Sequence, residues 1–189
     1  MDLPIPELIA FVLETERLRL RPLTDADAPA MAALATDRRV ADGTLALPHP
    51  YTVHNAETFI QVEREDRARG RMAASVIERR ADTTFMGMIG LVLQREWQRA
   101  ELGYWLGVPF WNQGYITEAA GALVDYAFGT LGLNRVFACH FADNPASGRV
   151  MQKIGMTQEG VLRQHYVRFD QPKDTIYYGL LREEWQARR

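Results

Sequence analysis

One segment of this sequence has the residue types and spacing to bind a phosphate group. Residues 101–106 read as a strand, Gly107 and Pro109 end it, and residues 112–118 open a long helix. A helix N-terminus carries unpaired N–H groups and a partial positive charge, which together attract an anion. Gly114 leaves room for an anion near the backbone, although a glycine here also fits an ordinary tight turn. The segment lacks the glycine-lysine-serine/threonine sequence of a nucleoside-triphosphate P-loop.

A second helix start follows the next strand. Asn144 is a favoured N-cap, Pro145 suits the first helical position, and Gly155 ends the helix. The strand at 99–106, the long helix and the strand at 135–141 form a crossover, which should pair its two strands in parallel. Both helix starts would then lie near the same end of adjacent strands, where α/β sheets usually bind ligands.

The elements around this crossover are predicted from hydrophobic periodicity. Residues 17–21 alternate polar and apolar, which is typical of a half-buried strand, and Thr24 caps a first helix. The remaining order is a helix at about 53–69, strands at 73–78, 85–93 and 99–106, the long helix, a strand at 135–141, the helix at 144–155, and strands at about 161–169 and 174–181. This order predicts a mixed α/β (α+β) fold with a largely antiparallel central sheet flanked by helices. We expect one domain over residues 1–189, with 1–13 as an N-terminal arm.

Composition excludes several classes of protein. The chain has 189 residues, with 22 Lys and Arg against 24 Asp and Glu, so its net charge of −2 gives no global attraction to nucleic acid or anionic membranes. Cys139 is the only cysteine, which rules out an intrachain disulfide and a multi-cysteine zinc site. The apolar run at 8–13 is far shorter than the roughly 20 residues that span a bilayer. We expect a cytoplasmic protein without a bound metal.

Four stretches, at 15–21, 101–105, 111–119 and 144–156, together resemble the GCN5-related N-acetyltransferase (GNAT) superfamily. The similarity runs from about Thr15 to Trp185 and is greater to the RimJ/RimL-like branch, which acetylates the N-termini of ribosomal proteins. The pyrophosphate loop of the superfamily usually reads Gln/Arg-x-x-Gly-x-Gly/Ala. Here Gly114 matches strictly, Trp111 stands at the first position, and Ile116 is bulkier than the usual last residue.

The resemblance implies acetyl-coenzyme A as co-substrate. The backbone of Trp105, Leu106 and Gly107 would pair with the pantetheine arm. The pyrophosphate would lie on the next loop, formed by Asn112, Gln113, Gly114, Tyr115, Ile116 and Thr117. Three further residues could touch the cofactor, each with a structural alternative. Asn144 could bond the pantetheine or cap its own helix, while Met151 and Lys153 could contact the nucleotide end or serve as core and surface residues.

The resemblance also implies direct attack of an amine on the thioester, without an acyl-enzyme. Glu101 would act as general base through water, and Ser147 would protonate the leaving thiolate. Each has an alternative, as a strand-edge ion-pair carboxylate and an ordinary first-turn serine. Cys139 is expected to be structural, since adjacent strand residues point to opposite faces and the cysteine cannot easily couple to His140. His165 and Tyr166 could border the acceptor pocket.

The function expected is transfer of an acetyl group to a primary amine, above all the α-amine of a protein or peptide. Two alternatives stay open. One is the same chemistry on a small amine such as an amino acid, polyamine or antibiotic, and the other is a sensor that binds acetyl-coenzyme A without turnover. We expect an amine acceptor as partner and neither nucleic acid nor membrane. The oligomeric state stays open, with a homodimer as one alternative because related folds often dimerise.

Overall fold

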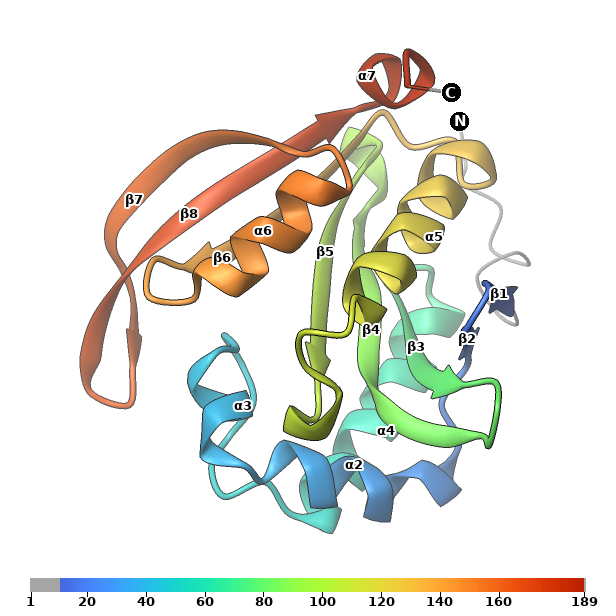
Figure 1. Cartoon of the computed structure of the whole chain (residues 1–189), viewed down its shortest axis with the longest axis vertical. Helices are drawn as coiled ribbons and strands as arrows, with labels where there is room; N and C mark the ends of the chain where they lie inside the picture. Colours follow the sequence, from blue (N-terminus) through green and yellow to red (C-terminus); the bar gives the residue numbers. More distant parts are fainter. Residues whose placement is uncertain (1–10, 189) are drawn as a thin grey trace.

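The computed structural model describes residues 11–188, which form a central sheet flanked by helices (Figure 1). The strands are β1 (Leu13–Glu14), β2 (Leu18–Arg21), β3 (Met72–Arg79), β4 (Thr84–Gln94), β5 (Arg99–Leu106), β6 (Arg135–Phe141), β7 (Thr157–Arg168) and β8 (Gln171–Leu181). The helices are α2 (Ala28–Ala35), α3 (Arg38–Asp42), α4 (Val53–Ala68), α5 (Tyr115–Gly129), α6 (Pro145–Lys153) and α7 (Arg182–Gln186), with 3-10 turns η1 (Asp25–Asp27), η2 (Arg95–Trp97) and η3 (Val108–Phe110).

The eight strands lie in the order β1-β2-β3-β4-β5-β6-β8-β7. Every neighbouring pair is antiparallel except β5 and β6, which are parallel and joined through α5. Apolar side chains of α5 and α6 form one core with one face of the sheet, and those of α2 and α4 form a second core with residues such as Ala74, Val76 and Met88. The predicted mixed fold with a largely antiparallel sheet is confirmed.

The parallel pairing of β5 with β6 is short, and the two strands separate beyond it. Residues 99–101 of β5 pair with 135–137 of β6, after which β6 continues against β8 and β5 against β4. Beyond Glu101 the two strands diverge, as Figure 1 shows. Beyond this point the described residues of β5 and β6 do not pair with each other, and the Leu106 carbonyl at the end of β5 accepts a hydrogen bond from the Trp111 indole at 2.8 Å.

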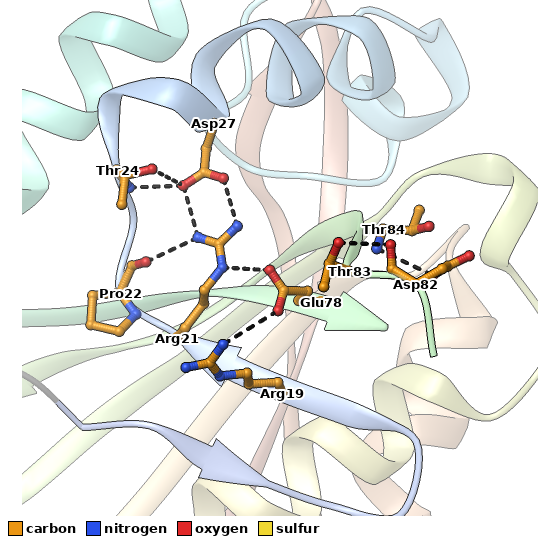
Figure 2. A network of polar contacts seen from close by, with 9 residues as sticks. All are labelled: Arg19, Arg21, Pro22, Thr24, Asp27, Glu78, Asp82, Thr83 and Thr84. Atoms are coloured by element: carbon orange, nitrogen blue, oxygen red, sulfur yellow. Dashed lines mark hydrogen bonds and ion pairs between the residues drawn. The ribbon is translucent and has the colours of Figure 1, made fainter. Parts of the chain in front are cut away.

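A buried ion-pair network fixes the first helix to the sheet (Figure 2). Arg21 on β2 donates through Nη1 and Nη2 to Asp27, at 2.9 and 2.7 Å, and through Nε to Glu78 on β3, at 2.6 Å. Asp27 also accepts from the backbone N–H and hydroxyl of Thr24, at 2.8 and 2.9 Å. Both carboxylates are buried, so the Arg21 guanidinium between them offsets the cost of burying their charge, and Arg19 adds a 3.9 Å contact to Glu78.

Several predicted boundaries were wrong. The helix after Thr24 begins as the 3-10 turn η1 and continues as α2, while α3 and α7 were not predicted. The final two strands are longer than expected because they extend into a long hairpin. Residues 1–10 of the expected arm lie outside the described residues. Phe11 is buried against Tyr126, with ring centroids 4.5 Å apart, and residues 13–14 pair with β2, so the fold holds the end of that segment. Within residues 11–188 no helix is long and apolar enough to cross a membrane.

Candidate active site

The loop before α5 has the backbone geometry of an anion site. Gly114 is the N-cap of α5 at φ +80°, and Asn112 also has a positive φ of +59°. The first backbone bond of the helix joins the N–H of Glu118 to the carbonyl of Gly114, at 3.1 Å, so the preceding N–H groups have no acceptor inside the helix. A Cβ on Gly114 would meet Arg17 Nη2 at 3.5 Å, an ordinary contact. Glycine is therefore favoured here by the left-handed φ and not, as we expected, by the need to leave room for an anion.

The strand segment at 15–21 supports this loop. Arg17 donates through Nη1 to the carbonyl of Gln113 at 3.0 Å and through Nε to Glu118 at 2.7 Å. Glu118 also accepts from the hydroxyl of Thr15 at 2.5 Å and from the Arg17 N–H at 2.9 Å. Burial alone would raise the pKa of Glu118, but the hydrogen bonds from Thr15 and Arg17 lower it overall. The first and third of the four resembling stretches are thus one structural unit.

A first cavity of about 580 Å³ lies between the loop, α6 and the segment after α3. Its walls include most of the predicted cofactor residues, namely Trp105, Leu106, Asn112, Gly114, Tyr115, Ile116, Thr117, Asn144 and Lys153, together with the predicted catalytic residue Ser147. Three cationic side chains also line it: Arg39, Arg149 and Lys153. Sequence reasoning missed Arg39 and Arg149. A signal for Arg149 was available, because Ala146, Arg149 and Lys153 follow one another at helical spacing along one face of α6.

Three predicted cofactor residues lie elsewhere. The N–H of Gly107 donates to the Met86 carbonyl at 2.9 Å, and a Cβ there would meet Leu34 at 2.8 Å, so this glycine serves packing. Gln113 is outside the cavity wall, and its amide donates to the Pro109 carbonyl at 2.9 Å. Met151 is 1% exposed, belongs to the core, and faces the second cavity described below.

Asn144 has the capping role that its sequence position indicated. Its Oδ1 accepts from the Ser147 N–H at 3.4 Å, and its Nδ2 donates to the Gly43 carbonyl at 3.3 Å. The same side chain thereby starts α6 and holds the segment after α3 against it. Asn144 also lines the first cavity, so capping does not remove it from the site.

A second cavity of about 620 Å³ meets the first at Tyr104, Trp105 and Ser147, which line both. The hydroxyl of Tyr104 lies 2.9 Å from Ser147 Oγ and donates to the Ser147 carbonyl at 3.1 Å. Burial raises the pKa of Tyr104 to about 12, against the opposing effect of the hydrogen bond to Ser147. Sequence reasoning missed Tyr104. Strand alternation puts it on the face opposite Glu101, but nothing in the pattern says that it meets Ser147 on α6.

Glu101 lines the second cavity together with Cys139. Burial raises the pKa of Glu101, while a hydrogen bond from the Cys139 thiol at 3.9 Å lowers it in part. Burial raises the pKa of Cys139 to about 11, so the thiol stays protonated at neutral pH and is a weak nucleophile. His140 also lines this cavity; its Nδ1 lies 2.7 Å from the Phe141 carbonyl, and its buried Nε2 has no hydrogen-bond partner among the described residues. His165 is exposed, with Nε2 3.3 Å from the Tyr177 hydroxyl, and neither His165 nor Tyr166 lines the cavity, contrary to expectation.

Comparison with known proteins identifies the family. Residues 17–157 match the model of the acetyltransferase (GNAT) domain. The uncharacterized N-acetyltransferase YoaA of Bacillus subtilis is 36% identical over 172 residues, which cover 90% of this chain and 97% of YoaA. YdaF of the same species, named a "putative ribosomal N-acetyltransferase", is 38% identical over 109 residues, covering 57% of this chain and 60% of YdaF. The structure of Mycobacterium smegmatis RimJ in complex with CoA-disulfide shares the fold, with a TM-score of 0.82, 22% identity and coverage of 93% of this chain and 88% of RimJ.

The chain belongs to the GNAT acetyltransferase family, and it is an N-acetyltransferase. The predicted GNAT superfamily is confirmed.

Proposed function

We propose that this enzyme binds acetyl-coenzyme A in the first cavity and acetylates the α-amine of a protein or peptide that enters through the second. The observation that carries the proposal is the junction of the two cavities at Tyr104, Trp105 and Ser147. Two reactants arriving from opposite sides would meet there, as direct transfer in a ternary complex requires. The naming of YdaF as a ribosomal N-acetyltransferase supports a polypeptide acceptor.

The residues of the first cavity fit the phosphates of coenzyme A. The start of α5 offers N–H groups without an acceptor inside the helix. Arg149, Lys153 and Arg39, which is paired with Asp37, add positive charge to walls that also carry Asp42 and Asp143. Beyond Glu101, the gap between β5 and β6 leaves strand edges for an extended arm.

Acetyl-coenzyme A, when bound, supplies the thioester carbonyl that the amine attacks. Glu101 accepts the proton that the amine loses, through an intervening water, and its raised pKa suits an amine whose own pKa is about 8. Ser147 donates a proton to the leaving sulfur, and the Tyr104 hydroxyl 2.9 Å away orients the serine for this step. The protonated thiol of Cys139 is consistent with attack without an acyl-enzyme.

The test is release of free thiol from acetyl-coenzyme A against a panel of N-terminal peptides, free amino acids and polyamines. We expect turnover with peptides. Replacement of the proton donor in Ser147→Ala should leave coenzyme A binding intact and lower kcat about 10²-fold or more. Tight cofactor binding without thiol release for any acceptor would instead identify a sensor.

A further inference from the structure

The second cavity is built mainly from apolar side chains. They come from segments far apart in sequence: the loop after α3, helix α4 and strands β3 and β4. The largest of them are Leu45, Leu47, Tyr51, Phe59, Met72 and Met88. Such walls gain free energy by burying an apolar group of the acceptor and gain nothing from a polar one.

Charge in this cavity is limited to one residue. Among the described residues that line it, Glu101 is the single carboxylate, and neither lysine nor arginine is present. His140 also lines this cavity; it is 6% exposed, and its Nδ1 lies 2.7 Å from the Phe141 carbonyl. One carboxylate can balance one ammonium group. A second ammonium, a carboxylate side chain or a free α-carboxylate would enter without a partner, at a large cost in desolvation.

The first cavity has the opposite character. Its walls carry Arg39, Arg149 and Lys153, together with Asp42 and Asp143. Charged groups of a ligand therefore find partners in the first cavity and lack them in the second, beyond Ser147.

The apolar surface continues to the rim of the second cavity. Val62 on α4 and Val92 on β4 both line it, and they are 49% and 44% exposed. An acceptor that continues outward from the amine would therefore still meet apolar surface at the cavity mouth.

We infer that the acceptor is a polypeptide N-terminus whose first residue has an uncharged, apolar side chain and whose carboxyl group is engaged in a peptide bond. The inference rests on the proposed function and narrows it to one class of acceptor. Polyamines, acidic N-termini and free amino acids each bring a charge that Glu101 cannot balance.

The experiment compares acceptors that differ only in the side chain of the first residue or in whether the carboxyl group is free. Peptides with Leu, Phe, Gly, Asp or Lys as first residue and a common remaining sequence are assayed by thiol release, together with leucine amide and free leucine. We expect kcat/KM to be about tenfold or more higher for Leu and Phe than for Gly, Asp or Lys, and higher for leucine amide than for leucine. Equal or better use of charged first residues, or of free leucine, would overturn this inference alone. Absence of release with every acceptor would overturn the proposed function and this inference together.

A rim variant tests whether this cavity sets the preference. Val62→Arg places a cation at the mouth of the second cavity, on a side chain exposed enough for the fold to tolerate it. We expect a several-fold loss of kcat/KM for the Leu peptide and a gain for the Asp peptide, with the KM for acetyl-coenzyme A unchanged. Gln61→Arg is the matched control, because Gln61 is the neighbouring exposed residue of α4 and lies outside the cavity wall. Identical acceptor profiles for the two variants would overturn the assignment of this cavity.

Discussion

Glu101 and Cys139 form a pair in which each side chain affects the proton affinity of the other. Burial raises the pKa of Glu101 and the thiol hydrogen bond lowers it, whereas both burial and the nearby carboxylate raise the pKa of Cys139. The outcome is a carboxylate of increased basicity beside a thiol that stays neutral. This arrangement suits proton removal by Glu101 and excludes a reactive thiolate at neutral pH.

The fall in kcat/KM on the acid side of the pH–rate profile should report on the pKa of Glu101, which Cys139 affects. A general base works only when ionised, so kcat/KM should fall as the pH drops through the raised pKa of Glu101. Glu101→Gln should lower kcat about 10²-fold or more and abolish that limb. Cys139→Ala removes the hydrogen bond that lowers the pKa of Glu101. Turnover should therefore persist, while the fall in kcat/KM on the acid side moves to higher pH. A Glu101→Gln enzyme with wild-type kcat would show that another group is the base.

At the scale of elements, the start of α5 depends on one backbone conformation. Gly114 at φ +80° turns the chain into α5, residues 114–117 line the first cavity, and Arg17 donates to the Gln113 carbonyl of the loop. A residue with a Cβ is disfavoured at such a φ by about 1–2 kcal/mol.

Gly114→Ala should therefore weaken coenzyme A binding and raise the KM for acetyl-coenzyme A, while the KM for the acceptor changes little. Titration calorimetry with coenzyme A measures the effect directly. Gly121→Ala is the matched control within α5, because nothing lies within 4 Å of an added Cβ there and alanine favours the helix by about 0.5–1 kcal/mol. Equal affinities for both variants would contradict a role for the Gly114 conformation in binding.

On the scale of the whole molecule, the Arg21 network joins the first helical layer to the sheet. Burial acts to raise the pKa of Asp27, but the hydrogen bonds from Arg21 and Thr24 lower it overall. A carboxylate with a lowered pKa in the folded state stabilises the protein above its unfolded pKa of about 3.9. That contribution is lost as the pH falls through the folded value.

Arg21→Met should destabilise the protein by about 3–5 kcal/mol at pH 7, because it removes the ion pair of buried Asp27 and leaves buried Glu78 with only the 3.9 Å contact to Arg19. The difference from wild type should shrink toward pH 3, where Asp27 begins to take up a proton in the variant. Urea unfolding at the two pH values measures both effects. Arg38→Met, which breaks an exposed pair with Asp42, should change stability by less than about 1 kcal/mol. A gap between Arg21→Met and wild type that stays constant with pH would contradict the network.

The sequence predicts the elements of the site better than the contacts between them. Periodicity and capping residues place the starts of α5 and α6 and the parallel strand pair, because these depend on local chemistry. The packing role of Gly107 could not be predicted, since a glycine that packs against Leu34 and a glycine that approaches a ligand look alike in sequence. The meeting of Tyr104 with Ser147 and the walls of the second cavity depend on tertiary packing of distant segments, which no local pattern encodes.

The short pairing of β5 with β6 has a consequence for how the molecule unfolds. Among the described residues, strands β1–β5 and β6–β8 are joined by the pairing of residues 99–101 with 135–137 and by bonds from the Asn134 and Arg135 N–H groups to the Gln98 carbonyl, so the backbone coupling between these two halves of the sheet is narrow. A ligand bound in the gap touches both halves and adds its binding free energy to the folded state alone. Cofactor binding should then make the two halves melt as one cooperative unit and slow amide hydrogen exchange on the facing edges of β5 and β6.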